Sequence, residues 1–96
     1  MEPNFDVSRP ERERNRRFAA VLRNARIRAG ITQVEMAEKL KRTQSYVSKV
    51  ESGERHFSLA EWESFAWVLK VHPVSLLEEA YADSRIRKTK SAETDG

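Results

Sequence analysis

The stretch ITQVEMAEKLKRTQSYVSKVESG, from Ile31 to Gly53, decides how this chain folds. Its apolar residues recur at helical spacing in two short blocks, which are separated by a polar break at Lys41. In the second block Val47 and Val50 are the aliphatic side chains, so we expect them to point inward while the others stay at the surface. Such a polar, cationic helix suits the major groove of DNA, where base edges offer donors and acceptors between walls of phosphate.

Signals for helix starts recur along the chain, whereas the alternating pattern of a β-strand does not. Three capping boxes are present, in which a Ser or Thr hydroxyl and a Glu three residues later satisfy free amides of the first turn. Gly30 and Gly53 are placed to end the first and third helices. We therefore predict an all-α fold, a compact five-helix bundle. The residues expected at the helix starts are Ser8, Thr32, Thr43, Ser58 and Pro73.

Apolar spacing within these helices indicates which side chains form the core. In the fourth helix Trp62 keeps helical register with Phe65 and Leu69, whereas Trp67 falls on a different face. The residues expected to be apolar core in the first four helices are Phe18, Val21, Leu22, Ala25, Val34, Met36, Ala37, Leu40, Val47, Val50, Leu59, Trp62, Phe65, Ala66 and Leu69.

Length and composition limit the chain to one small domain. It has 96 residues and no cysteine, which excludes a disulfide scaffold and a thiolate metal site. No apolar run approaches the roughly 18 residues of a membrane span, so we expect a soluble, cytoplasmic protein. The domain should span residues 9–84, between a mobile segment 1–8 and a mobile basic tail 85–96, because both ends lack apolar periodicity.

Charge is unevenly distributed. Residues 1–57 hold 13 Lys and Arg against 8 Asp and Glu, whereas residues 58–84 hold 1 against 5 and residues 85–96 hold 4 against 2. The positive charge therefore lies on the half that contains the candidate groove helix, as a phosphate-binding surface requires. Solvated helix faces of mixed charge would explain the ERERNRR run equally well, so charge alone does not decide.

The segment from about Val21 to Leu77 resembles the helix-turn-helix DNA-binding domain of the lambda-repressor/Cro type, the XRE family. The resemblance is carried by GITQVEMAEKL, TQSYVSKVESGER and SLAEWESFAWVLKVHPVSLL in this order and spacing. It implies a five-helix domain whose second and third helices form the DNA-reading unit, with the third helix in the major groove. No cofactor or metal is implied.

The resemblance also implies DNA contacts at individual positions. The residue chemistry agrees, because Gln can contact adenine through two hydrogen bonds and Lys prefers the acceptors of guanine. A phosphate contact and simple packing remain equally open for Tyr46, and Gln33 would also brace the third helix. The expected base contacts are Gln44, Ser45 and Lys49, and the expected phosphate contacts are Gln33, Lys41, Arg42, Thr43, Tyr46 and Ser48.

Three further positions match structural features of the family. Ala37 falls where a small residue lets the second and third helices pack closely, and Arg26 and Glu51 fall where a buried ion pair commonly joins the first and third helices. One position departs from the pattern, since Lys41 stands where the turn usually has glycine and tends to need a positive φ.

The leading functional hypothesis is a sequence-specific transcriptional regulator, acting most simply as a repressor, that binds a palindromic operator as a homodimer. The dimer surface is expected where Trp67 accompanies an apolar stripe of Val74, Leu77 and Tyr81, because this is more exposed apolar surface than a small monomer should need.

Two alternatives remain: an antitoxin that binds a toxin as well as DNA, and a controller protein of a restriction-modification system. An enzyme is not expected. His56 and His72 are 16 residues apart on different segments, and no nucleophile, paired acids or phosphate-binding glycine loop accompanies them. RNA polymerase is a further conceivable protein partner.

Overall fold

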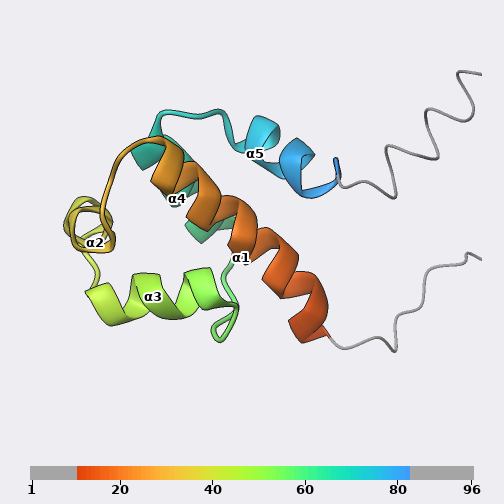
Figure 1. Ribbon diagram of the computed structural model, residues 1–96, viewed down its shortest axis with the longest axis horizontal. Helices are drawn as coiled ribbons and strands as arrows, with labels where there is room; N and C mark the ends of the chain where they lie inside the picture. The colour runs from red at the N-terminus through yellow and green to blue at the C-terminus, as the bar shows by residue number, and fades with distance from the viewer. Residues whose placement is uncertain (1–10, 83–96) are drawn as a thin grey trace, which may run out of the picture.

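The computed structural model describes residues 11–82 and contains five helices in that range (Figure 1). This confirms the predicted all-α fold. The capping box at Ser8, the segment 1–8 and the tail 85–96 lie outside the described residues. The helices are α1 (Glu11–Arg28), α2 (Gln33–Leu40), α3 (Gln44–Ser52), α4 (Leu59–Leu69) and α5 (Pro73–Ala80).

The helix starts follow the sequence signals closely. Thr32 Oγ1 accepts the amide of Glu35 at 3.1 Å, and the Glu35 carboxylate returns a bond to the Thr32 amide at 2.8 Å. The bond from the Thr32 amide, followed by side-chain hydrogen bonding with Thr32, lowers the pKa of the Glu35 carboxyl group. Ser58 and Glu61 form the same reciprocal pair at 3.0 and 2.7 Å. Each such cap typically contributes about 1 kcal/mol of helix stability, so local sequence places the helix boundaries.

Four helix ends turn through the left-handed region. Gly30 and Gly53 do so with φ of 74° and 85°, whereas Lys41 and Lys70 end α2 and α4 with φ of 60° and 61°. The positive φ expected at Lys41 is therefore present without a glycine. At Gly53 close packing adds a second requirement, because a Cβ there would lie 2.7 Å from Cγ of Arg16 in α1.

Helix α1 crosses the middle of the bundle, with α3 on one side and α5 on the other (Figure 1). It contacts α3, α4 and α5, while α2 joins α3 and α4. The arrangement leaves α3 at the edge of the molecule, where it packs against α1 and α2. The largest fully buried side chains are Phe65, Leu22, Met36, Leu76, Val47 and Val50.

Two residues expected in the core are exposed instead. Val34 is 48% exposed, because α2 turns Met36 and Leu40 inward and Val34 lies about 160° around the helix from Met36. Leu59 is 81% exposed as the first residue of α4, where no preceding helical turn covers it. The exposure of Val34 is therefore set by the rotation of α2, and that of Leu59 by its place at the start of α4.

None of the helices within residues 11–82 is both long enough and apolar enough to cross a membrane.

Candidate nucleic-acid interface

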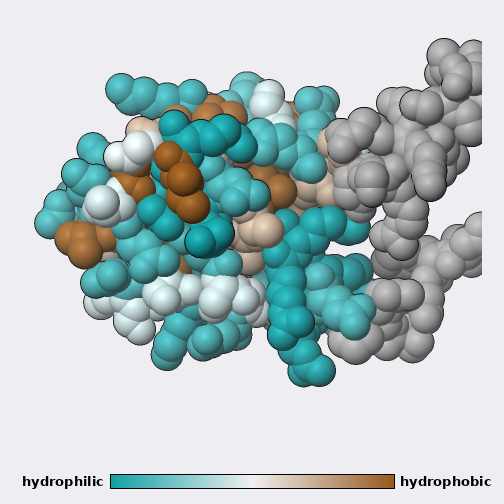
Figure 2. Space-filling view, viewed as in Figure 1, coloured by the Kyte–Doolittle hydropathy of each residue, from teal (hydrophilic) through white to brown (hydrophobic). Residues whose placement is uncertain are grey.

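Helix α3 has two sharply different faces. The inward face places Val47 and Val50 at zero exposure in the core, as predicted. Along the α3 edge, Figure 2 shows pale and teal residues rather than brown ones. The outward side chains offer hydroxyl, amide and ammonium groups at successive helical positions, which is the chemistry that reads base edges and phosphates. The exposed residues of α3 are Gln44, Ser45, Ser48, Lys49 and Ser52.

A buried ion pair braces one edge of α3. Arg26 of α1 donates to Glu51 from Nε at 2.7 Å and from Nη2 at 3.0 Å, and Nη1 donates to the carbonyl of Ile31 at 2.7 Å. Gln33 at the start of α2 donates from Nε2 to Oε1 of Glu51 at 3.1 Å. The network ties three helices together, so it fixes how far α3 rotates about its own axis.

This network assigns roles to Gln33 and Arg26. Gln33 lies half-buried and braces α3 through Glu51, as the resemblance implied, while its contact with phosphate stays a prediction. Arg26 is only 8% exposed and its guanidinium is engaged by the carboxylate, so it is a structural cation. Ala37, 4% exposed, is part of the core cluster that includes Val47 and Val50.

A second polar cluster lies against the opposite edge of α3, around Tyr46. The Tyr46 hydroxyl donates to Oε2 of Glu61 in α4 at 2.7 Å. The guanidinium carbons of Arg42 and Arg55 lie 3.9 and 4.8 Å from the centre of the Tyr46 ring. Residues from three elements therefore lie within hydrogen-bond or cation–π distance of Tyr46: the turn before α3, the loop after α3, and α4.

The position of Tyr46 disagrees with the phosphate contact expected for it. Its side chain is 9% exposed, its ring packs against Phe65, and its hydroxyl is occupied by Glu61. Burial and the Glu61 carboxylate raise the pKa of Tyr46 to about 12, so the hydroxyl stays protonated and keeps donating. Packing, the other interpretation of this aromatic residue, explains the geometry.

Glu61 has two structural roles, and the sequence motif revealed only the first. Oε1 accepts the Ser58 amide as part of the capping box, and Oε2 accepts from Tyr46 and from Arg55 Nη1 at 3.2 Å. Burial alone would raise the pKa of Glu61, but the bonds from Ser58 and Tyr46 and the charge of Arg55 lower it overall. Sequence reasoning found Glu61 only as a cap and missed Arg55, because no local pattern links either residue to Tyr46.

The start of α3 is exposed and cationic. Thr43 caps the helix by accepting the amide of Tyr46 at 3.0 Å, and Lys41 and Arg42 precede it in the turn. A helix N-terminus attracts anions through its free amides and its dipole. Lys41, Arg42, Thr43, Gln44 and Ser45 are all exposed, so they form one continuous polar surface at this end of α3.

The residues expected at a dimer surface divide into two groups. Trp67 and Val74 are 57% and 55% exposed, and the Trp67 ring meets the His72 ring edge-on at 6.0 Å. Leu77 is half-buried, whereas Tyr81 is 47% exposed although its ring packs edge-on against Phe18 at 5.9 Å. Trp67, Val74 and Tyr81 are therefore exposed, while Leu77 and one side of the Tyr81 ring contact their own domain.

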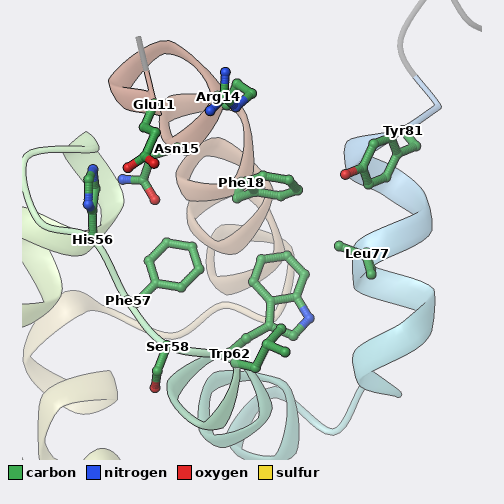
Figure 3. A pocket seen from close by; sticks show the side chains of 11 residues that line it. Glu11, Arg14, Asn15, Phe18, His56, Phe57, Ser58, Trp62, Leu77 and Tyr81 are labelled. Atoms are coloured by element: carbon green, nitrogen blue, oxygen red, sulfur yellow. The ribbon is translucent and has the colours of Figure 1, made fainter. Parts of the chain in front are cut away.

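A cleft of about 490 Å³ is lined by residues of α1, of the loop before α4, of the start of α4 and of the α5 end (Figure 3). Figure 3 shows Phe18 and Trp62 on one side of this cleft and Leu77 and Tyr81 on the other. Its lining includes no residue of α3. The aromatic cleft and the polar face of α3 are thus separate surfaces. Within residues 11–82, no three His, Asp or Glu side chains come together as a metal site would require.

Comparisons with known proteins agree with this geometry. A profile described as helix-turn-helix domain matches residues 17–80. An XRE-family like protein from Pseudomonas syringae pv. tomato is 38% identical, with 75% of this chain and 88% of that chain covered and a TM-score of 0.67. No curated protein matches the chain.

Two crystal structures of ClgR from Corynebacterium glutamicum, described as a clp gene regulator, are also similar. One is 28% identical, covers 70% of this chain and 86% of that chain, and has a TM-score of 0.67. The other, at 23% identity, covers 85% and 87% with a TM-score of 0.70 and shows the shared fold alone.

The chain belongs to the helix-turn-helix family. Within it the chain is an XRE-type, DNA-binding transcriptional regulator, and the resemblance implies α2 and α3 as the helix-turn-helix unit.

Proposed function

We propose that this regulator reads a specific double-stranded DNA sequence with the exposed face of α3. Base contacts are assigned to Gln44, Ser45 and Lys49, which are all exposed on that face. The observation that carries the proposal is the pair of polar networks on the two edges of α3, through Glu51 and through Tyr46. They hold the helix at one rotation, and a groove helix needs a fixed rotation to bring the same side chains to the same base pairs.

Phosphate contacts are assigned around the start of α3 and along its flank. Lys41 and Arg42 supply cations in the turn, and Thr43, Ser48 and Gln33 supply hydroxyl and amide groups. Such contacts set the register of the protein on the duplex without reading its sequence. Gln33 can keep its bond to Glu51 while its second N–H donor reaches phosphate.

The regulator is proposed to bind a palindromic operator as a homodimer and to repress by occluding polymerase. One short helix contacts few base pairs, so two copies on a two-fold site multiply both buried surface and specificity. Exposed Trp67 and Val74, together with the accessible parts of Leu77 and Tyr81, support a dimer surface at the α4–α5 end.

Selection of bound duplexes from a random DNA pool tests this function. Enrichment of a sequence with two inverted half-sites about 34 Å apart, one helical turn, is the expected result. Enrichment of a single half-site would remove the homodimer but keep sequence-specific binding. Absence of any enriched sequence would overturn the proposed function as a whole.

A further inference from the structure

The cluster around Tyr46 brings together two arginines that are far apart in the chain. Arg42 belongs to the turn before α3, and Arg55 belongs to the loop after it. Their guanidinium carbons nevertheless lie 3.9 and 4.8 Å from the centre of the same ring. A backbone bond from the Arg55 amide to the carbonyl of Lys49, at 3.1 Å, fastens the loop to α3. Both guanidiniums are therefore held over the Tyr46 ring and near the Glu61 carboxylate beside α3.

Glu61 anchors both arginines from the inner side. Its Oε2 lies 3.2 Å from Nη1 of Arg55 and 3.8 Å from Nη2 of Arg42. The Glu61 side chain is 21% exposed, whereas the arginine side chains are 42% and 41% exposed. One carboxylate therefore faces two cations, and the excess positive charge points toward solvent.

The outer sides of these guanidiniums suit a phosphate group. A guanidinium carries five N–H donors in a planar fork, and the bonds from Arg55 to Glu61 and to the His56 carbonyl both use Nη1. Stacking on Tyr46 restricts the orientation of both forks, so less freedom is lost when an anion binds.

The cluster also lies at the correct edge of α3 for such a contact. At about 100° per residue, Tyr46 lies about 60° around the helix from Lys49, which belongs to the exposed face. A side chain stacked on Tyr46 therefore flanks the face proposed to enter the major groove. The groove is walled by phosphates, about 12 Å apart across its width.

We infer that Arg42 and Arg55 together form a backbone-phosphate site on the Lys49 edge of α3, with Tyr46 as its platform and Glu61 as its positioning residue. This inference rests on the proposed groove-binding role of α3, and it adds Arg55, from outside the helix-turn-helix unit, to the DNA contacts. The same cluster could instead serve only to hold α3 against α4, and this is the outcome that the experiment must separate.

Salt dependence distinguishes a phosphate contact from a structural brace. Binding of wild-type protein to the selected operator is measured by fluorescence anisotropy across a range of KCl concentrations. Arg55→Ala and Arg55→Gln should each make the slope of log K against log [KCl] shallower by about 0.9 per bound subunit, which is about 1.8 for a dimer on its operator and about 60-fold in affinity over a tenfold range of salt. Arg55→Gln keeps a side-chain N–H donor for Glu61, so it loses the charge with less disturbance of the cluster.

Two control variants complete the series. Arg55→Lys keeps the charge and should retain the wild-type slope while binding more weakly, because an ammonium cannot form the planar fork. Arg28→Ala removes the same charge from an exposed pair with Glu79 of α5 and should leave the slope unchanged. Folding of each variant is checked by circular dichroism.

The outcomes separate this inference from the proposed function. If wild type binds its operator but neither Arg55→Ala nor Arg55→Gln changes the slope more than Arg28→Ala does, the phosphate site is refuted and groove binding by α3 stands. A lower melting temperature with an unchanged slope would assign the cluster to structural bracing alone. If selection enriches no operator, the proposed function fails first.

Discussion

The Glu51 carboxylate meets the Arg26 guanidinium side-on, through Nε–Oε2 at 2.7 Å and Nη2–Oε1 at 3.0 Å, across 25 residues of sequence. The Glu51 side chain is 1% exposed and that of Arg26 10% exposed, so water screens the pair little. The pair joins α1 to α3, and because Glu51 also accepts from Gln33 it controls the orientation of α3, the helix proposed to read DNA.

The first prediction concerns the stability of this pair. Arg26→Ala should lower the free energy of unfolding by about 3–5 kcal/mol, because it leaves the Glu51 charge buried without its main partner. Urea denaturation measures the change. Arg28→Ala, which breaks the exposed pair with Glu79, should cost about 0–1 kcal/mol in the same assay. Equal losses in the two variants would show that burial does not govern the Arg26–Glu51 interaction.

The second prediction concerns sequence reading. Gln44→Ala and Lys49→Ala should each relax preference at one or two base pairs, at a cost of about 1–3 kcal/mol per lost bidentate contact. Both side chains are exposed, so both variants should keep the wild-type melting temperature. Repeated selection from random DNA gives the preferences, and a double variant that still selects the wild-type site would refute base reading by α3.

The third prediction uses two lysines with nearly the same backbone conformation. Lys41 and Lys70 end α2 and α4 with φ of 60° and 61° and ψ of 43° and 40°. Replacement by glycine should stabilise the fold by up to about 1 kcal/mol at either position, because glycine adopts this conformation without strain. Only Lys41→Gly should weaken DNA binding and flatten its salt dependence, since Lys41 lies in the turn before α3.

Thermal melts and anisotropy titrations of Lys41→Gly and Lys70→Gly measure the two effects separately. A DNA affinity that falls equally in both variants would contradict the phosphate contact assigned to Lys41.

The fourth prediction concerns alkaline stability. Burial and hydrogen bonding to Glu61 raise the pKa of Tyr46 from 10.0 to about 12 in the folded protein. The stability linked to this group is therefore complete below pH 10 and is lost as pH rises through about 12. Urea denaturation at a series of alkaline pH values should show that Tyr46→Phe removes part of this loss. An unchanged pH dependence in Tyr46→Phe would mean that other groups cause it.

The fifth prediction concerns self-association. Wild type should be dimeric at micromolar concentration in sedimentation equilibrium, and Trp67→Glu combined with Val74→Glu should be a folded monomer with much weaker operator binding. These two side chains are more than half exposed, so their replacement should leave the core intact. Leu77 is less suitable, because it packs against the core within one chain. A wild type that stays monomeric both free and on DNA would remove this interface.

The sequence alone determined the helix boundaries and the main direction of each helix face. Thr32, Thr43 and Ser58 cap their helices through bonds that span three residues, and such short-range interactions are visible in a local pattern. The inward position of Val47 and Val50 was also predicted from local sequence, because helical spacing puts both side chains on one face of α3.

Only the tertiary structure decided which polar side chains share a site. Tyr46 and Glu61 are 15 residues apart, and their hydrogen bond depends on how α4 packs beside α3. The packing of α2 likewise left Val34 exposed, because the rotation of a helix is set by all of its core contacts together rather than by any one apolar residue. Periodicity identifies a face to within about one residue, whereas hydrogen bonds between helices require positions accurate to a fraction of an ångström.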